Sequence, residues 1–197
     1  MSWDERFAGE DYVYGTRPNG FLAAQAEALA PGSRVLVPGD GEGRNGVWLA
    51  RRGMRVHSVD SSAVGLAKAR RLAGAHGVVI ETECADLAAW RWPDSEFDAV
   101  VAIFLHLRPE IRAVLHVAML KALRPGGRII LQAFRPAQLG YQSGGPREAD
   151  RLFTAAMLAA DFADAEVLVC EEALVSLDEG PLHQGMAATV GFVARRR

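Results

Sequence analysis

The sequence predicts an α/β fold in which helices cover both faces of a mainly parallel β-sheet and an antiparallel β-hairpin ends the chain. Short runs rich in β-branched residues alternate with segments whose apolar residues recur at helical spacing. The central runs are apolar throughout, as in strands that are covered on both faces. The last two runs, 166–177 and 186–194, lie too close together for a helix between them, so they are expected to pair antiparallel.

Length and composition fit a single domain, residues 1–197. With 50% hydrophobic residues, the chain can bury a core without disulfides or a metal ion, and no metal site is expected. No apolar stretch is long enough to span a membrane. The polar, acidic start differs from a secretory signal, so a cytoplasmic protein is expected. The net charge of −2 argues against nucleic acid or an anionic membrane as a partner, and the oligomeric state is left open.

Five strands are expected before the hairpin, each followed by a helix. The helix at 109–123 is the clearest, because Pro109 suits its first turn and a Pro-Gly-Gly sequence ends it. Cys84 and Cys170 lie far apart without a CxxC pattern, which is typical of reduced thiols in a core. The expected strands are 35–37, 56–59, 78–81, 97–105 and 127–134, and further helices are expected at 46–52 and 146–160.

A glycine-rich loop directly follows the first strand. Gly39, Gly41 and Gly43 alternate there, and Asn45 precedes the next helix. Glycine lets the backbone approach a ligand closely and turn sharply onto a helix N-terminus. The carboxyl end of the first strand is also where open α/β sheets bind ligands. The loop therefore predicts a site for a nucleotide-type ligand.

Two registers of this loop are possible. The three glycines that begin at Gly41 match the GxGxxG pattern of dinucleotide-binding folds, and those that begin at Gly39 match the GxGxG loop of S-adenosylmethionine binders. The dinucleotide register starts late after the strand. Asp40 and Glu42 would also oppose a pyrophosphate at the positive helix end, whereas they suit the ammonium and sulfonium groups of S-adenosylmethionine. The second register is favoured.

Polar residues follow the next two strands. Asp60 lies at about the 20-residue spacing from the loop at which a carboxylate accepts hydrogen bonds from ribose hydroxyls, with Ser61 beside it. Alternatively, Asp60 or Ser61 caps the following helix. Asp86 and Leu87 follow the third strand, where Asp86 could bind an adenine amino group while Leu87 packs on the ring. Capping of a helix is the alternative role of Asp86.

Taken in order, these motifs resemble the class I S-adenosylmethionine-dependent methyltransferases over nearly the whole chain, from about Ser33 to the hairpin. The segments that carry the resemblance are VLVPGDGEGRN, VDSS, ADL, FDAVVAIFLHL and ALRPGGRIIL. Within that class, GEGRNGVWLARRGMRVHSVDSS, the opening WDERFAGEDYVYGTRPNGFL and the closing LDEGPLHQG resemble small bacterial tellurite-resistance and thiopurine (thiol) methyltransferases.

The resemblance implies a Rossmann-like seven-stranded sheet of order 3-2-1-4-5-7-6, with the last strand antiparallel and helices on both faces. It implies S-adenosyl-L-methionine as cofactor and S-adenosyl-L-homocysteine as product, with the loop glycines at the amino-acid part, Asp60 at the ribose, and Asp86 with Leu87 at the adenine. Residues 102–106, among them Ala102 and Phe104, would line the methyl-transfer pocket. Many family members carry an acidic residue where this chain has Val37, and Asp40 or Glu42 could supply the missing charge.

The methyl acceptor is expected to be a small molecule, because the chain lacks the Asn- or Asp-Pro-Pro-aromatic motif of enzymes that methylate amino groups of nucleic-acid bases. A thiol or chalcogen oxyanion needs little beyond alignment with the methyl group. An oxygen or carbon acceptor would need a base, for which His106 and His183 are the candidates. Tyr14 and Tyr141 are candidate pocket residues.

Two segments have open roles. The segment 1–20 is expected to be either a lid over the cofactor or an arm against the sheet edge. The hairpin loop is expected over Asp178–Gly185, and His183 faces the acceptor if that loop lies at the carboxyl edge of the sheet; otherwise the imidazole is structural. Two other functions also stay open: an NAD(P)-dependent oxidoreductase, from the second glycine register, and a catalytically silent S-adenosylmethionine-binding module, from Val37.

Overall fold

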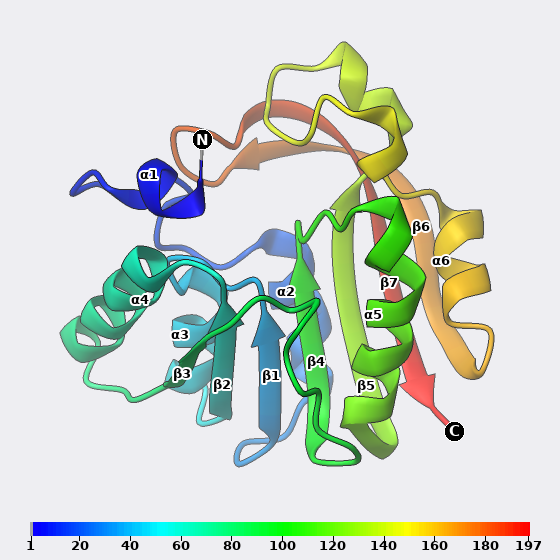
Figure 1. Ribbon diagram of the computed structural model, residues 1–197, viewed down its shortest axis with the longest axis horizontal. Coiled ribbons are helices and arrows are strands. Elements are labelled where there is room, and N and C mark those ends of the chain that lie inside the picture. Colours follow the sequence, from blue (N-terminus) through cyan, green and yellow to red (C-terminus); the bar gives the residue numbers. More distant parts are fainter. Residues whose placement is uncertain (1) are drawn as a thin grey trace.

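The computed structural model describes residues 2–197, which form a seven-stranded sheet of order β3-β2-β1-β4-β5-β7-β6 (Figure 1). Strands β1 to β5 are parallel, and β7 runs antiparallel to both β5 and β6. The predicted fold class and strand order are therefore confirmed. The strands are β1 (Arg34–Pro38), β2 (Arg55–Asp60), β3 (Glu81–Cys84), β4 (Phe97–Ile103), β5 (Leu123–Phe134), β6 (Ala165–Asp178) and β7 (Gln184–Arg196).

Helices cover both faces of the sheet. One apolar core joins the sheet to α5 and α6 through residues such as Leu115, Met119 and Leu158, and a second joins it to α2, α3 and α4 through Leu22, Leu49 and others. The helices are α1 (Trp3–Phe7), α2 (Gly20–Gln25), α3 (Arg44–Arg51), α4 (Ala63–Ala75), α5 (Pro109–Ala122) and α6 (Ala155–Asp161), with 3₁₀ turns at Ala26–Ala28, Pro136–Gly140 and Ala149–Arg151. No helix within residues 2–197 is long and apolar enough to cross a membrane.

The third strand lies three residues later than expected, at 81–84 instead of 78–81. Its position is set by pairing with β2. This pairing begins with His57 of β2 opposite Glu81. Because β3 is an edge strand with little burial, its residues are polar, whereas Ile80 of the apolar run is buried in the core beside α4. A turn, and no helix, follows β3 within residues 85–96, so four strand–helix units precede the hairpin rather than five.

The helix expected at 146–160 is also shorter than predicted. Only α6 forms there, capped by the side chain of Thr154, which accepts a hydrogen bond from the Met157 amide. The preceding stretch forms only the 3₁₀ turn Ala149–Arg151, and an α-helix does not extend through Phe153 because its amide donates to the carbonyl of Phe134 at the end of β5. The expectation of core thiols was wrong in part: Cys84 and Cys170 are free, but both are exposed.

Candidate functional site

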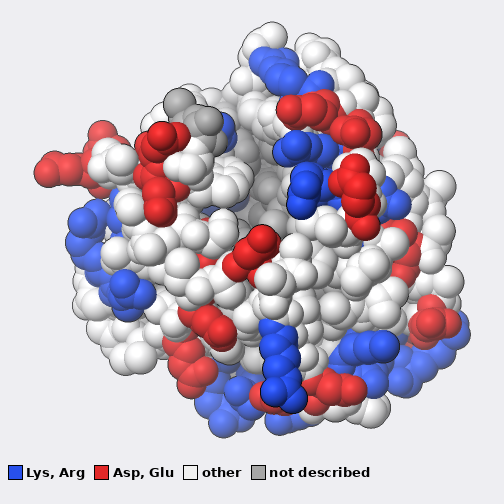
Figure 2. All heavy atoms as spheres, in the orientation of Figure 1, with Lys and Arg blue, Asp and Glu red and all other residues white. Residues whose placement is uncertain are grey.

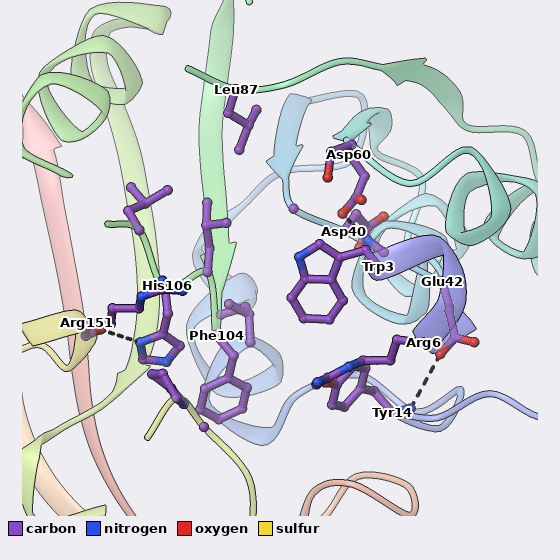
Figure 3. Close-up of a pocket in the computed structure, with 18 of the residues that line it drawn as sticks. Trp3, Arg6, Tyr14, Asp40, Glu42, Asp60, Leu87, Phe104, His106 and Arg151 are labelled. Atoms are coloured by element: carbon purple, nitrogen blue, oxygen red, sulfur yellow. Dashed lines mark hydrogen bonds between the residues drawn. The ribbon is translucent and has the colours of Figure 1, made fainter. Parts of the chain in front are cut away.

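A cavity of about 450 Å³ lies at the carboxyl ends of the parallel strands, within the usual size range of small-molecule sites. Its wall combines the glycine loop, the ends of β2 and β4, the loop after β5, the hairpin loop and the N-terminal arm, which we define as residues 2–19. Figure 2 shows this face of the molecule hollowed, with acidic and basic side chains on the rim. Figure 3 shows Asp40 and Asp60 across the cavity from Phe104 and His106, with Trp3 between them.

The glycine loop adopts a conformation that suits the favoured register. Strand β1 ends at Pro38, so Gly39 is the first residue after it. Gly39, Gly41 and Gly43 all have positive φ angles, of 70°, 56° and 85°. A Cβ on Gly43 would lie 2.5 Å from the Ala69 Cβ of α4, so this residue also lets α3 and α4 approach. Gly46, which the dinucleotide register needs, lies inside α3.

Asp40 points beneath the glycine loop. Its Oδ2 accepts a hydrogen bond from the Ser58 hydroxyl at 2.6 Å, and its Oδ1 accepts one from the Gly46 amide at 3.2 Å. Burial raises the pKa of Asp40 to about 6. The carboxyl group therefore holds α3 against β2, although the residue also lines the cavity.

Glu42 is bound to the N-terminal arm. One carboxylate oxygen accepts a hydrogen bond from the Val13 amide at 2.9 Å, and the other forms a buried ion pair with Lys68 of α4. The Lys68 ammonium also donates to the arm carbonyls of Gly9 and Asp11, at 3.0 and 2.6 Å. The sequence suggested Glu42 as a replacement for the acid missing at Val37; instead its charge is neutralised by Lys68, and it fixes the arm over the cavity.

Asp60 links the glycine loop to the start of α4. Its Oδ2 accepts a hydrogen bond from the Gly41 amide at 2.9 Å, and its Oδ1 accepts one from the Ser62 amide at 2.8 Å. Burial raises the pKa of Asp60 against these hydrogen bonds. The helix cap is Ser62, whose hydroxyl accepts from the Gly65 amide, rather than Asp60 or Ser61. Each Asp60 oxygen can accept a further hydrogen bond from a ligand in the cavity, which Ser61 also lines.

Asp86 and Leu87, which follow β3, line the same cavity as Asp60. The Asp86 carboxylate accepts a hydrogen bond from the Ala88 amide at 2.9 Å, so it caps a short turn and not a helix. Leu87 is buried. Asn45 lines the cavity as well, but its side-chain oxygen accepts a hydrogen bond from the Asn19 amide at 3.0 Å, which ties α3 to the arm.

The segment after β4 turns sharply into the cavity. Phe104 has a positive φ of 53°, unusual for a non-glycine residue, and its amide donates to the Gln132 carbonyl at 2.7 Å. Its ring stacks on Phe134 at 4.4 Å between centroids. Ala102 was expected on this wall but lies within β4, 1% exposed in the core, so the lining begins at Ile103.

His106 has both ring nitrogens occupied. Nε2 accepts a hydrogen bond from the Phe134 amide at 3.2 Å, so Nδ1 carries the proton and donates to the Arg151 carbonyl at 2.9 Å. Burial lowers the pKa of His106 to about 4. The expected role as a base is corrected: His106 lines the cavity, but it acts as a neutral cross-link between the ends of β4 and β5 and the loop after β5.

His183 lies at the carboxyl edge of the sheet and faces the cavity. The hairpin loop is shorter than expected, because Asp178 still pairs with Gln184 and only residues 179–183 connect the strands. The imidazole contacts the rings of Tyr14 and Phe104, at 4.5 and 4.8 Å between centroids. Its Nδ1 lies 3.8 Å from Glu179 Oε2, too far for a hydrogen bond. Burial lowers the pKa of His183, partly offset by Glu179.

Of the two tyrosines, Tyr14 lines the cavity and its hydroxyl accepts a hydrogen bond from Arg6 at 3.0 Å. Tyr141 is absent from the cavity wall, so its expected pocket role is corrected. The same loop instead contributes residues that follow Tyr141 in the sequence, namely Gly145, Pro146, Glu148 and Arg151.

A buried polar network behind the cavity was not predicted. Glu179 of the hairpin loop accepts hydrogen bonds from Arg44 of α3 at 2.7 Å and from Asn19 of the arm at 2.9 Å, and Asn19 also donates to Gln132 of β5. Burial alone would raise the pKa of Glu179, but His183 and Arg44 together lower it. Trp3, Arg6 and Phe7 of the arm line the cavity too. For the arm, the aromatic residues of the opening segment were the only signal in the sequence. The polar network left no signal, since pairings between distant residues leave no local pattern.

The sequence is similar to those of known methyltransferases. Residues 35–127 match a family model described as a methyltransferase domain. A protein-L-isoaspartate O-methyltransferase of Methylorubrum extorquens is 32% identical over 162 residues, which cover 71% of this chain and 68% of that protein.

Solved structures share the fold. A chain from work on the conversion of a disulfide bond into a thioacetal group during echinomycin biosynthesis superposes with a TM-score of 0.77 at 21% identity, covering 98% of this chain and 87% of that one. TehB from Haemophilus influenzae superposes with a TM-score of 0.73 at 19% identity, covering 99% of this chain and 66% of TehB.

Proposed function

The chain belongs to the class I S-adenosylmethionine-dependent methyltransferases, and we propose that it transfers the methyl group to a small-molecule acceptor, a thiol, a chalcogen oxyanion or a similar nucleophile. One observation carries the acceptor assignment: the cavity that contains the glycine loop and Asp60 continues without a break to an aromatic wall formed by Tyr14, Phe104 and His183. A cofactor and a small acceptor could therefore lie next to each other in one continuous cavity.

The cofactor is proposed to lie along Gly39, Gly41 and Gly43, with its ribose at Asp60 and Ser61 and its adenine at Asp86 and Leu87. The residues fit such a ligand, because the glycines present backbone without side chains and each Asp60 oxygen retains capacity to accept a hydroxyl hydrogen bond. When bound, S-adenosylmethionine supplies an activated methyl group. The chain's own contribution is to hold the acceptor in line with that group, since alignment alone supplies several kcal/mol.

His183 is proposed to orient the acceptor or to take its proton. Burial keeps the imidazole neutral near pH 7, so a ring nitrogen is free to accept a proton. The ring is held by Tyr14 on the arm and by Phe104 after β4, so its position depends on both segments. A thiolate or oxyanion acceptor would need only the orienting role.

The N-terminal arm is proposed to be a lid within a single domain, residues 1–197. Trp3, Phe7 and Tyr14 line the cavity, which favours the lid over an arm packed at the sheet edge. We further propose that the enzyme is cytoplasmic. The net charge of −2 supports the proposal that it does not bind nucleic acid. The likeness to TehB at 19% identity supports the fold, and the motifs of the sequence support the tellurite and thiol subgroup.

The test is turnover with S-adenosylmethionine and a panel of thiols, selenite, tellurite and small phenols, in the whole chain and in His183→Ala. Methylation of one class, with kcat reduced in His183→Ala while the melting temperature is unchanged, supports the proposal. A lower melting temperature with intact turnover leaves His183 a structural role. Binding of S-adenosylhomocysteine without turnover of any panel member would favour the silent binding module instead, and salt-sensitive binding to oligonucleotides would contradict the small-molecule assignment.

A further inference from the structure

Arg44 carries a buried hydrogen-bond donor without a protein acceptor. It is the first residue of α3, directly after Gly43, and its side chain is 8% exposed. Nη2 donates to Glu179, but Nη1 is buried and has no hydrogen-bond partner among residues 2–197. Arg44 lines the same cavity as the loop glycines.

The neighbouring acids do not serve this nitrogen. Asp40 accepts hydrogen bonds from Ser58 and the Gly46 amide, and Glu42 is paired with Lys68 and the arm. Glu179 already accepts hydrogen bonds from Arg44 Nη2 and from Asn19. A buried charged donor left without an acceptor destabilises a protein more than a neutral one does. The arrangement therefore suits a ligand oxygen in the cavity.

We propose that Arg44 Nη1 donates to the carboxylate of the amino-acid part of the cofactor. This rests on the proposed placement of that part along the glycine loop, because Arg44 follows the loop directly and shares its cavity wall. Guanidinium–carboxylate hydrogen bonds are among the strongest that proteins form. Arg6, the second guanidinium on this wall, donates to the Tyr14 hydroxyl. An anionic group on the methyl acceptor is the other possible source of such an oxygen.

The test compares two ligands that differ in the amino-acid part. S-adenosylhomocysteine carries the carboxylate, whereas 5′-methylthioadenosine has the same nucleoside and thioether without it. In Arg44→Lys, the ammonium retains the charge opposite Glu179 but lacks the second guanidinium nitrogen. Calorimetry should show S-adenosylhomocysteine binding roughly 10–100-fold more weakly in this variant, the scale of a charge-assisted hydrogen bond, with 5′-methylthioadenosine unchanged.

Two further variants keep the result decisive. Arg51→Gln removes an exposed arginine from the last turn of the same helix and should change neither affinity. If Arg44→Lys does not fold, the double variant with Arg44→Gln and Glu179→Gln replaces the ion pair by two neutral amides. It should show the same selective loss of affinity for S-adenosylhomocysteine.

Failure of this inference is distinguishable from failure of the proposed cofactor site. If Asp60→Ala weakens both ligands while the Arg44 variants bind S-adenosylhomocysteine normally, the site holds but Arg44 does not contact the cofactor carboxylate. An equal loss of both ligands in the Arg44 variants would also overturn the assignment, since it would reflect damage to the cavity. If Asp60→Ala leaves both affinities unchanged, the cofactor placement fails and the assignment of Arg44 fails with it.

Discussion

The glycine-loop side of the cavity and its hairpin side are held by different interactions. On the first side, short segments directly after β1 and β2 are shaped by positive φ angles and by hydrogen bonds between near neighbours, such as Gly41 to Asp60. On the second side, the hairpin loop, α3 and the arm meet through the buried pair Arg44–Glu179 and through Asn19. Apart from the buried Glu42–Lys68 pair, the first side therefore depends on backbone conformation and local hydrogen bonds, and the second depends on pairing of buried polar groups from distant segments.

The two sides of the cavity therefore form in different ways. Parallel strands bring the loops that follow them to one edge of the sheet, so a ligand site there needs only the right residue after each strand. The hairpin side must instead be closed by contacts between side chains that are distant in the sequence. The following substitutions test whether the two sides respond separately.

The largest effect is expected for Glu179→Ala on the hairpin side. Removing the carboxylate leaves the Arg44 charge buried at 8% exposure without its partner, which costs about 3–5 kcal/mol and should lower Tm by roughly 10 °C. Urea denaturation measures the free energy. The matched control is Glu166→Ala, whose pair with Arg195 is 48% and 44% exposed and should contribute less than about 1 kcal/mol. Equal losses in both variants would show that the buried pair has no special weight.

On the glycine-loop side, Gly43→Ala should cost about 3 kcal/mol. Gly43 has a φ of 85°, and an added Cβ would lie 2.5 and 2.8 Å from the Cβ and Cα of Ala69. Gly74→Ala in α4 is the control: a Cβ there meets nothing within 4 Å, and the helix should gain up to about 1 kcal/mol. A stable Gly43→Ala variant would mean that α3 and α4 can move apart.

The same contrast explains what the sequence could predict. The alternation of strands and helices, the glycine register and the positions of Asp60 and Asp86 followed from local patterns along consecutive segments, whereas the strand order followed from the resemblance to the methyltransferase family. His106 was placed at the right cavity, but its role depends on the Phe134 amide and the Arg151 carbonyl, which no pattern near His106 indicates. Glu42, Arg44 and Glu179 were not understood for the same reason: their partners lie on distant segments. The third strand was misplaced because pairing with β2 outweighed apolar content.

Asp60→Ala should lower ligand affinity more than it lowers stability, so it distinguishes an effect on binding from an effect on folding. Loss of a carboxylate that accepts ribose hydroxyls should weaken S-adenosylhomocysteine by about 1.5–3 kcal/mol in calorimetry. The control is Asp98→Ala in β4, which also accepts a backbone hydrogen bond, from Arg34 at 2.7 Å, but lies outside the cavity wall. Unchanged affinity in Asp60→Ala would contradict the ribose assignment.

The smallest effect concerns the pH dependence of stability at His106, which cross-links the ends of β4 and β5 and the loop after β5. Burial lowers the pKa of its imidazole from the ordinary 6.5 to about 4. Between these values the unfolded chain binds a proton that the folded chain does not, so the contribution of His106 is complete above pH 6.5 and is lost as the pH falls toward 4. At pH 5.5 the loss relative to pH 7.5 should be about 1 kcal/mol.

His106→Gln isolates this contribution. Glutamine offers an amide NH2 donor group and a carbonyl acceptor in place of the donor and acceptor nitrogens of the neutral imidazole, but it does not titrate. Burial raises the pKa of Asp40 to about 6, which has the opposite sign: that group stabilises the fold below pH 3.8 and loses this contribution as the pH rises toward 6. Because Asp40 is present in both proteins, its contribution cancels when the change in unfolding free energy between pH 5.5 and 7.5 is compared between them.

The control is His76→Gln, at an exposed position after α4, which should keep the wild-type pH profile of stability. If His106→Gln loses as much stability in acid as the wild type, His106 is already protonated in the folded state. Its Nε2 would then be unable to accept from the Phe134 amide, and the neutral cross-link between β4 and β5 would be excluded.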